Sequence, residues 1–249
     1  MDPVLDDRFD RLDERRWLAS YLPHWSSRAA AAATWRVGDD GLHLTIPPEQ
    51  GRWCADTHEE PLRVSCIQSG NRSGPVGSTD GPQPFRRGLE VREEQPTWWG
   101  CTPLGGRVEV TMRATISPRS MVAFWMSGIE DRPERSGEIC VAEIFGDAVS
   151  PGSAEVGIGV KAFRDPALHE DFRAVPLPLD VAEPHTYGVD WRPDALTFDV
   201  DGEVVRRVDE APDYPVQLMI GVFDFPAKAT DGDVPTPELV VSRVRCEPG

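Results

Sequence analysis

Short runs of alternating apolar and polar residues, separated by turn residues, recur along most of the chain. Gly41–Ile46, which reads GLHLTI, is a clear example, and Asp39-Asp40-Gly41 before it is typical of a hairpin turn. Such runs predict β-strands, and almost no stretch has the period of a helix. The pattern therefore predicts a two-sheet β-sandwich, with strands at 34–37, 41–46, 64–68, 89–92, 106–115, 121–126, 138–145, 155–160, 174–177, 186–191, 196–201, 203–209, 217–225 and 239–245.

The segments between these runs suggest one domain rather than two. Residues 1–26 carry several aromatic residues and predict an irregular opening that packs on the sandwich, while the alanine-rich run 28–33 is short. Residues 69–84 are rich in Gly, Ser and Pro and exclude a regular element. A linker is one interpretation; we prefer a long surface loop over a cleft, because strands resume at once and such loops are usually functional. We expect residues 1–249 to form a single domain.

Two glutamates, Glu138 and Glu143, stand in the predicted strand Gly137–Gly146, which reads GEICVAEIFG. Side chains of a regular strand alternate between two faces, and this alternation would separate the two glutamates. One extra residue between them, a β-bulge, would return Glu143 to the face of Glu138 and Cys140. Two converging carboxyls suit acid/base and glycosyl-transfer chemistry. A solvated strand face is the alternative interpretation of two such glutamates.

Other segments give this strand a context. Ala123–Met126 reads AFWM, Gly106–Glu109 reads GRVE, His185–Trp191 reads HTYGVDW and Val200–Gly202 reads VDG. Together with GEICVAE, and in this order, they resemble the glycoside hydrolases of family 16, the laminarinase and lichenase group. The resemblance covers roughly the whole chain and is best between residues 104 and 208. It implies an all-β, concanavalin A-like jelly roll of two antiparallel sheets with a cleft on the concave face.

The resemblance also implies catalytic roles. Glu138 matches the nucleophile and Glu143 the general acid/base of a retaining glycosidase. Cys140 stands where the family has an aspartate. Because a thiol is a weak donor and normally neutral, the charge of the site changes at this position. Glycosidase activity is then either weakened or redirected; a cysteine nucleophile lacks a nearby histidine in the sequence.

Five residues are candidates for substrate binding. Trp125 would, by resemblance, line the floor of the cleft, although a core position is as consistent with its apolar neighbours. Trp98 and Trp99, adjacent in a loop, are candidates for exposed stacking platforms, because the apolar faces of sugars pack on aromatic rings. Trp53 is a weaker candidate. His169 is also weaker, since a histidine outside any motif is more often structural.

Composition limits partners and location. A net charge of −16 disfavours nucleic acid and anionic membranes as partners. Two of the 26 basic residues are lysines, which we attribute to coding bias.

The five cysteines are scattered and odd in number, which argues against a disulfide framework and a zinc site. We expect no cofactor and no metal, and nothing selects calcium ligands. No membrane span and no signal peptide are visible, so we expect a cytoplasmic monomer, or a secreted protein if the chain is a trimmed form.

Three functions follow from the sequence, in this order. The first is a retaining glycoside hydrolase or transglycosylase that acts on a neutral β-glucan-like poly- or oligosaccharide, of the endo-acting glucanase type. The second is an intracellular enzyme that uses the Glu138/Glu143 pair for acid/base chemistry, such as a cyclisation or elimination, on a non-glycan small molecule. The third is a carbohydrate-binding protein without catalysis, against which the two retained acids count. Fold alone does not choose among them.

Overall fold

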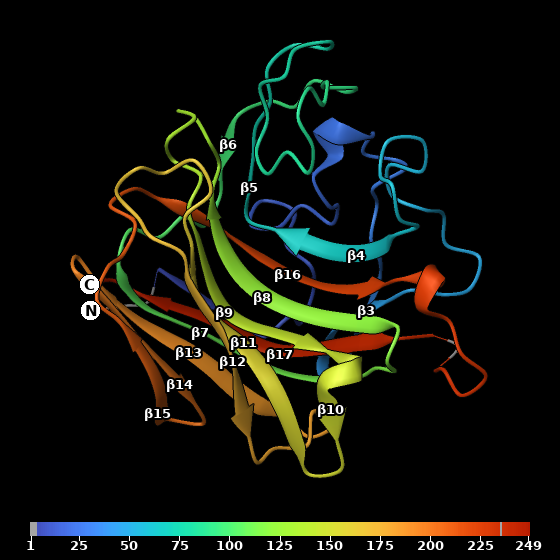
Figure 1. Ribbon diagram of the computed structural model, residues 1–249, viewed down its shortest axis with the longest axis vertical. Coiled ribbons are helices and arrows are strands. Elements are labelled where there is room, and N and C mark those ends of the chain that lie inside the picture. Colours follow the sequence, from blue (N-terminus) through green and yellow to red (C-terminus); the bar gives the residue numbers. More distant parts are fainter. Residues whose placement is uncertain (1–3, 235) are drawn as a thin grey trace.

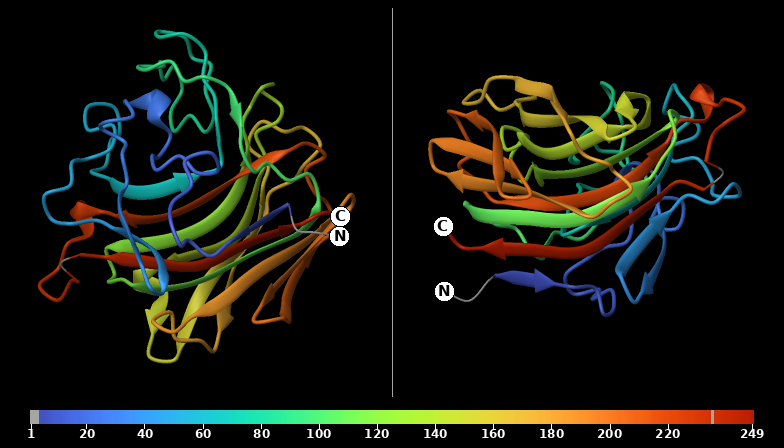
Figure 2. Two further views of the ribbon diagram at one scale, coloured as in Figure 1. Left: turned by 180° about the vertical axis from the view of Figure 1, so that it is seen from behind. Right: turned by 90° about the horizontal axis from the view of Figure 1, so that it is seen from below.

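Two antiparallel β-sheets stacked on each other form the framework of the protein (Figures 1 and 2). The computed structural model describes residues 4–234 and 236–249. The predicted all-β jelly-roll sandwich is confirmed. Helical structure in the described residues is confined to three single 3₁₀ turns: η1 (Pro23–Trp25), η2 (Gly146–Ala148) and η3 (Pro226–Lys228).

The first sheet, called the outer sheet below, has the strand order β15-β14-β13-β7-β17-β3-β2, with β1 beside β17. Its central strands β7 and β17 pair over nine residues of β17, and the GRVE and HTYGVDW segments lie next to each other as β7 and β13. The strands are β1 (Leu5–Asp7), β2 (Thr34–Gly38), β3 (Gly41–Thr45), β7 (Gly106–Thr115), β13 (His185–Arg192), β14 (Ala195–Val200), β15 (Glu203–Val208) and β17 (Glu238–Glu247).

The second sheet, called the site sheet below, has the order β10-β11-β9-β8-β16-β4, with β12 also paired to β11. Two short strands, β5 and β6, form a separate ribbon above it (Figure 1). The strands are β4 (Arg63–Gln68), β5 (Gly70–Asn71), β6 (Trp98–Trp99), β8 (Ser120–Gly128), β9 (Glu138–Phe145), β10 (Val149–Ser150), β11 (Ser153–Lys161), β12 (Asp171–Leu177) and β16 (Val216–Asp224).

Both faces of the site sheet are covered, so its central strands are buried along their whole length. In β8, Phe124 and its alternate neighbours belong to the core between the two sheets. Trp125 and its alternate neighbours belong to a second apolar cluster on the opposite face, under the long loops. Strands buried on both sides are expected to be continuously apolar, as VAFWM is. The second face is the one that carries the candidate site.

Residues 4–26 pack their aromatic side chains as predicted. Phe9 and Trp17 enter the core between the sheets, while Leu22 and Trp25 join the cluster on the site face. Trp25 is fully buried, and its indole N–H donates to the carbonyl of Pro82 (2.8 Å). The N-terminal segment is thereby tied to the end of the 69–84 loop, which helps to hold that loop over the site sheet.

One predicted strand is wrong. Residues 89–92 have no strand structure; instead Leu89 and Val91 are buried separately in the site-face cluster. The N–H of Arg92 bonds to the carbonyl of His24 rather than to a strand partner (2.8 Å).

The alanine-rich run forms turns and a single bridge, and the 69–84 segment is a long loop with one two-residue strand. No helix among the described residues has the length and apolar character needed to cross a membrane.

Candidate active site

The predicted bulge in β9 is present. Phe124 pairs with Ala142 and the next residue, Trp125, pairs with Cys140, so β9 has one extra residue opposite β8. Pairing with β11 shifts at the same place. As a consequence Val141 and Ala142 both face the core between the sheets, whereas Cys140 lies in the site-face cluster. The bulge therefore brings Glu138, Cys140 and Glu143 to one face.

Two glycines of β11 make room for this irregular pairing. Gly157 lies opposite Glu143, and a Cβ there would come within 2.5 Å of the Phe172 ring. Gly159 lies opposite Cys140 with φ +141°, and a Cβ would meet the Asp171 carbonyl at 2.0 Å. Only glycine adopts this backbone freely and fits this space. The GIG sequence of β11 is thus a local signal of the bulge in its neighbour.

A buried hydrogen-bond chain fixes the residue before Glu138. The N–H of Gly137 donates to the hydroxyl oxygen of Tyr214 (2.8 Å), and that hydroxyl donates to Asp165 (2.7 Å). Burial, followed by the bond to Asp165, raises the pKa of Tyr214, so the hydroxyl stays protonated as a donor. This chain anchors the residue immediately before β9 and hence the position of the Glu138 side chain.

Glu138 and Glu143 share a small cavity of about 160 Å³ on the site sheet, called the carboxylate cavity below. Trp125 forms part of its floor and is 7% exposed. Trp125 is therefore both a packed residue and a lining residue, which reconciles the two interpretations made from the sequence. The lining residues are Tyr21, Gln83, Met121, Ala123, Trp125, Glu138, Glu143, Lys161 and Phe223.

The two glutamates have different surroundings. Glu138 is almost fully buried, and burial raises its pKa to about 7, against the attraction of Lys161 and with a smaller increase from Glu143. Glu143 is half-buried. Cys140 is 1% exposed, and burial followed by the charge of Glu138 raises the pKa of its thiol well above the usual value. The thiol is neutral at neutral pH, so a cysteine nucleophile is disfavoured.

Lys161, at the end of β11, is the basic residue of this cavity. Its ammonium donates to the Glu143 carboxylate (Nζ to Oε2, 3.0 Å) and lies 4.6 Å from the centre of the Phe172 ring. Its backbone is the cross-strand partner of Glu138. Burial disfavours the ammonium, but the acidic side chains around it outweigh this effect and raise the pKa of Lys161. Lys161 is therefore positively charged at neutral pH.

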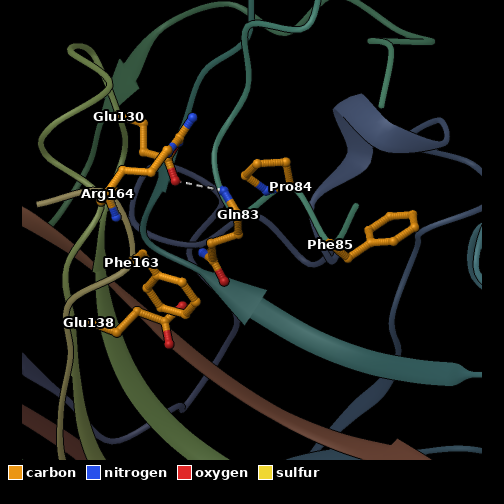
Figure 3. A pocket seen from close by; sticks show the side chains of 8 residues that line it. Gln83, Pro84, Phe85, Glu130, Glu138, Phe163 and Arg164 are labelled. Carbon is orange, nitrogen blue, oxygen red and sulfur yellow. Dashed lines mark hydrogen bonds and ion pairs between the residues drawn. The ribbon is translucent and has the colours of Figure 1, made fainter. Parts of the chain in front are cut away.

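A second cavity of about 420 Å³, called the side cavity below, adjoins the first, because Gln83 and Glu138 line both. Phe163, which is 62% exposed, and Glu138 both line this cavity (Figure 3). Apolar rings next to polar side chains suit a sugar, which has apolar C–H faces and hydroxyl edges. The lining residues are Gln83, Pro84, Phe85, Glu130, Ser136, Glu138, Phe163 and Arg164.

Buried Glu130 holds the wall of the side cavity together. Its carboxylate accepts the backbone N–H of Gln83 (2.8 Å; Figure 3) and pairs with Arg164. Its carbonyl accepts a hydrogen bond from Arg72 (2.7 Å). Gln83, Glu130 and Phe163 have φ of 50°, 53° and 48°, which is unusual for residues other than glycine. Such backbone outliers concentrate at functional sites when their surroundings hold them in place.

The other candidate binding residues lie outside both cavities. Trp98 lines a separate surface groove together with Trp17 and Trp35, and the neighbouring Trp99 is exposed on the β5–β6 ribbon. Trp53 is buried in the site-face cluster, where its ring packs against Phe85 (centroids 5.1 Å apart).

His169 is exposed and pairs with Glu210 at the surface (3.1 Å). Among the described residues, no group of three or more His, Cys, Asp or Glu side chains is placed to hold a metal.

Several lining residues were missed from the sequence. One feature of the sequence could have drawn attention to Lys161, because it is one of two lysines in a chain with 26 basic residues. Gln83 lay within the loop predicted to cover the cleft. Glu130, Phe163 and Arg164 had no signal, because they come from irregular segments whose course the residue pattern does not reveal.

Comparison with known proteins identifies the family. The sequence model described as "Glycosyl hydrolases family 16" matches residues 102–236, more than half of the chain and the part that contains GEICVAE. The chain belongs to this family. No curated protein matches the sequence significantly.

Several solved structures share the fold. A GlcNAcα1-4Gal-releasing endo-β-galactosidase from Clostridium perfringens is 24% identical with a TM-score of 0.82, covering 98% of this chain; the chain spans 62% of that protein. The laminarinase catalytic domain from Thermotoga maritima is 13% identical with a TM-score of 0.69, covering 100% and 98% of the two chains. The Crh5 transglycosylase is 17% identical with a TM-score of 0.62, covering 98% and 84%.

Proposed function

We propose that this family 16 chain is a retaining glycosidase that acts on a neutral, β-glucan-like poly- or oligosaccharide. One observation carries the proposal: the bulge in β9 turns Glu138 and Glu143 into one cavity above Trp125. The adjoining side cavity, with its exposed Phe163 ring, offers room for a neighbouring sugar unit.

In this proposal Glu138 is the nucleophile and Glu143 the acid/base. The Glu138 carboxylate attacks the anomeric carbon, and the glycosidic C–O bond breaks as Glu143 donates its proton to the leaving oxygen. Glu143 then takes a proton from water, whose oxygen attacks the anomeric carbon and releases Glu138. A sugar hydroxyl in place of water would give transglycosylation. A retaining pair requires carboxyls about 5–5.5 Å apart.

A panel of β-glucans, xylans and β-galactosides, with size analysis of the products, tests the substrate. β-Galactosides belong in the panel because of the similarity in fold to the endo-β-galactosidase. NMR of the first product should show retention of the anomeric configuration. An inverted product would reject the retaining mechanism, and no turnover on any glycan would reject the glycosidase.

Two substitutions assign the roles. Glu138→Gln should abolish turnover while glycan binding remains. Glu143→Gln should slow cleavage of poor leaving groups by about 10²–10⁴-fold, with a much smaller loss in the glycosylation step of an activated aryl glycoside, which needs no protonation. Glu155→Gln, at an exposed position of β11, controls for the loss of one charge. Equal losses on both substrates for Glu143→Gln would contradict the assignment.

A second function is favoured by Cys140, a neutral residue between the two acids. Acid/base catalysis on a non-glycan small molecule needs the two carboxyls but no tuned nucleophile. It becomes the better hypothesis if no glycan of the panel is cleaved or bound by protein that still has both cavities. A protein that binds glycans without cleaving them would support the non-catalytic alternative.

A further inference from the structure

The charges of the carboxylate cavity do not follow from the glutamate motif alone. Glu138, Cys140 and Glu143 can supply only negative or neutral groups, and the aspartate of the family motif is absent. The cavity nevertheless contains a cation, Lys161, on a different strand. The further inference concerns this lysine and rests on the proposed function.

Lys161 is within reach of both glutamates. Its ammonium bonds to Glu143 (3.0 Å), and its main chain stands directly across from Glu138 in the β9–β11 pairing. The ring of Phe172 lies under the ammonium and replaces part of its water shell. A charge pair in such a half-buried place is screened less than one at the surface.

The buried Glu138 carboxyl would resist ionisation without a nearby cation. Burial favours neutral carboxyls, and two carboxylates close together repel each other. The Glu138 nucleophile must nevertheless be ionised to attack a sugar. Lys161 is the basic residue that lines the carboxylate cavity in the part of the chain that the structure describes.

We propose that Lys161 is a positioning residue of the glutamate pair, and that its ammonium supplies the counter-charge that lets buried Glu138 ionise at neutral pH in a motif where cysteine replaces aspartate. Lysine suits this place because its charge is compact and sits on a flexible stem that can serve either carboxylate. Arginine would form a planar, two-pronged pair with one of them.

The titratable groups around Glu138 come from three segments. Glu143 from β9 and Glu170 from the segment before β12 oppose Lys161 and raise the pKa of Glu138. Cys140 and Tyr21 stay neutral, because burial raises the pKa of each. In the side cavity, Arg164 is already paired with Glu130. Without Lys161, Glu138 would be buried with only negative charges nearby. Its pKa should therefore rise above the present value of about 7.

The experiment compares Lys161→Met and Lys161→Gln with Lys161→Arg and the parent. Lys228→Met is the matched control, because Lys228 also lies over aromatic rings and pairs with an aspartate, but on η3 away from the cavity. The pH profile of kcat/KM on the best glycan should move upward by about 1–3 units in the Met and Gln variants. On the acidic limb, at pH values below the pKa of Glu138, each unit of this shift lowers kcat/KM about tenfold. Lys161→Arg should restore most of the profile, and Lys228→Met should match the parent.

Carbon-13 NMR of the glutamate carboxyls gives a readout that needs no turnover. The titration of Glu138 should move upward in Lys161→Met and Lys161→Gln and remain near the parent position in Lys161→Arg. If the parent cleaves no glycan, the proposed function fails while this titration still decides the role of Lys161. An unchanged Glu138 titration, or an activity loss of the same size at every pH, would show that Lys161 is only structural. Using two neutral variants keeps the test decisive if one of them does not fold.

Discussion

Replacing Glu138 by Gln should stabilise the folded protein at alkaline pH, because the glutamate is buried where its charge is unfavourable. Its pKa is raised from an ordinary 4.5 to about 7, chiefly by burial. Above pH 4.5 the unfolded chain releases this proton more readily than the folded one, so the contribution of Glu138 to stability falls as pH rises toward 7. Each unit of difference corresponds to 1.36 kcal/mol, so the full effect is about 3 kcal/mol.

Urea unfolding of the parent and Glu138→Gln, followed by tryptophan fluorescence between pH 5 and 8.5, measures this effect. The variant should gain stability over the parent as pH rises, by about 3 kcal/mol in total, and the gap should level off above pH 8. Any cost of burying the glutamine amide adds an offset that does not depend on pH. The pH dependence of the difference is therefore the diagnostic quantity.

The exposed Glu155→Gln variant on β11 controls for the removal of one charge from an acidic protein. A difference between parent and Glu138→Gln that is flat with pH would refute the reasoning. A difference that changes in the opposite direction would show that Lys161, rather than burial, dominates at Glu138.

Four further outcomes are expected. Cys140→Asp, which restores the family residue, should raise hydrolysis of the best glycan or leave it unchanged; a loss of kcat/KM would favour the non-glycan function. Phe163→Ala should weaken glycan binding by about 1–2 kcal/mol in calorimetry, since the exposed ring would be partly buried by a sugar, and Phe163→Tyr should bind like the parent. Gly159→Ala should lower stability by about 1–3 kcal/mol in thermal unfolding because of its φ of +141°, whereas Gly51→Ala, which meets open space, should not. Titration of the denatured protein should find five free thiols, and one or three would indicate an oxidising compartment.

The strands could be predicted because alternation within each run and the turn residues at its ends are local features of the sequence. The Asp201-Gly202 turn joins β14 to β15, and alternation shows which side chains of each strand face inward. The strand predicted at residues 89–92 was wrong because Leu89 and Val91 can also be buried separately from a loop. The pattern cannot tell whether a partner strand lies within reach.

The site was less predictable, since it combines residues from distant segments. The bulge followed from the strand alternation and the motif spacing, both of which lie within β9. Lys161 depends on the register between β9 and β11, and Gln83 on the path of a long loop, so neither could be placed from the residue pattern. Trp98 and Trp99 lie outside the cavities because their two-residue strand pairs with Gly70–Asn71.

The extra residue in β9 has a consequence for how this active site can diverge. The spacing of five positions between Glu138 and Glu143 puts them on opposite faces of a regular strand, and the bulge reverses that parity. A deletion of Val141 together with the bulge would leave a spacing of four, which returns both glutamates to one face of a regular strand. Loss of the bulge alone would instead turn Glu143 into the apolar core. Insertions and deletions in this strand are therefore tolerated only when length and geometry change together.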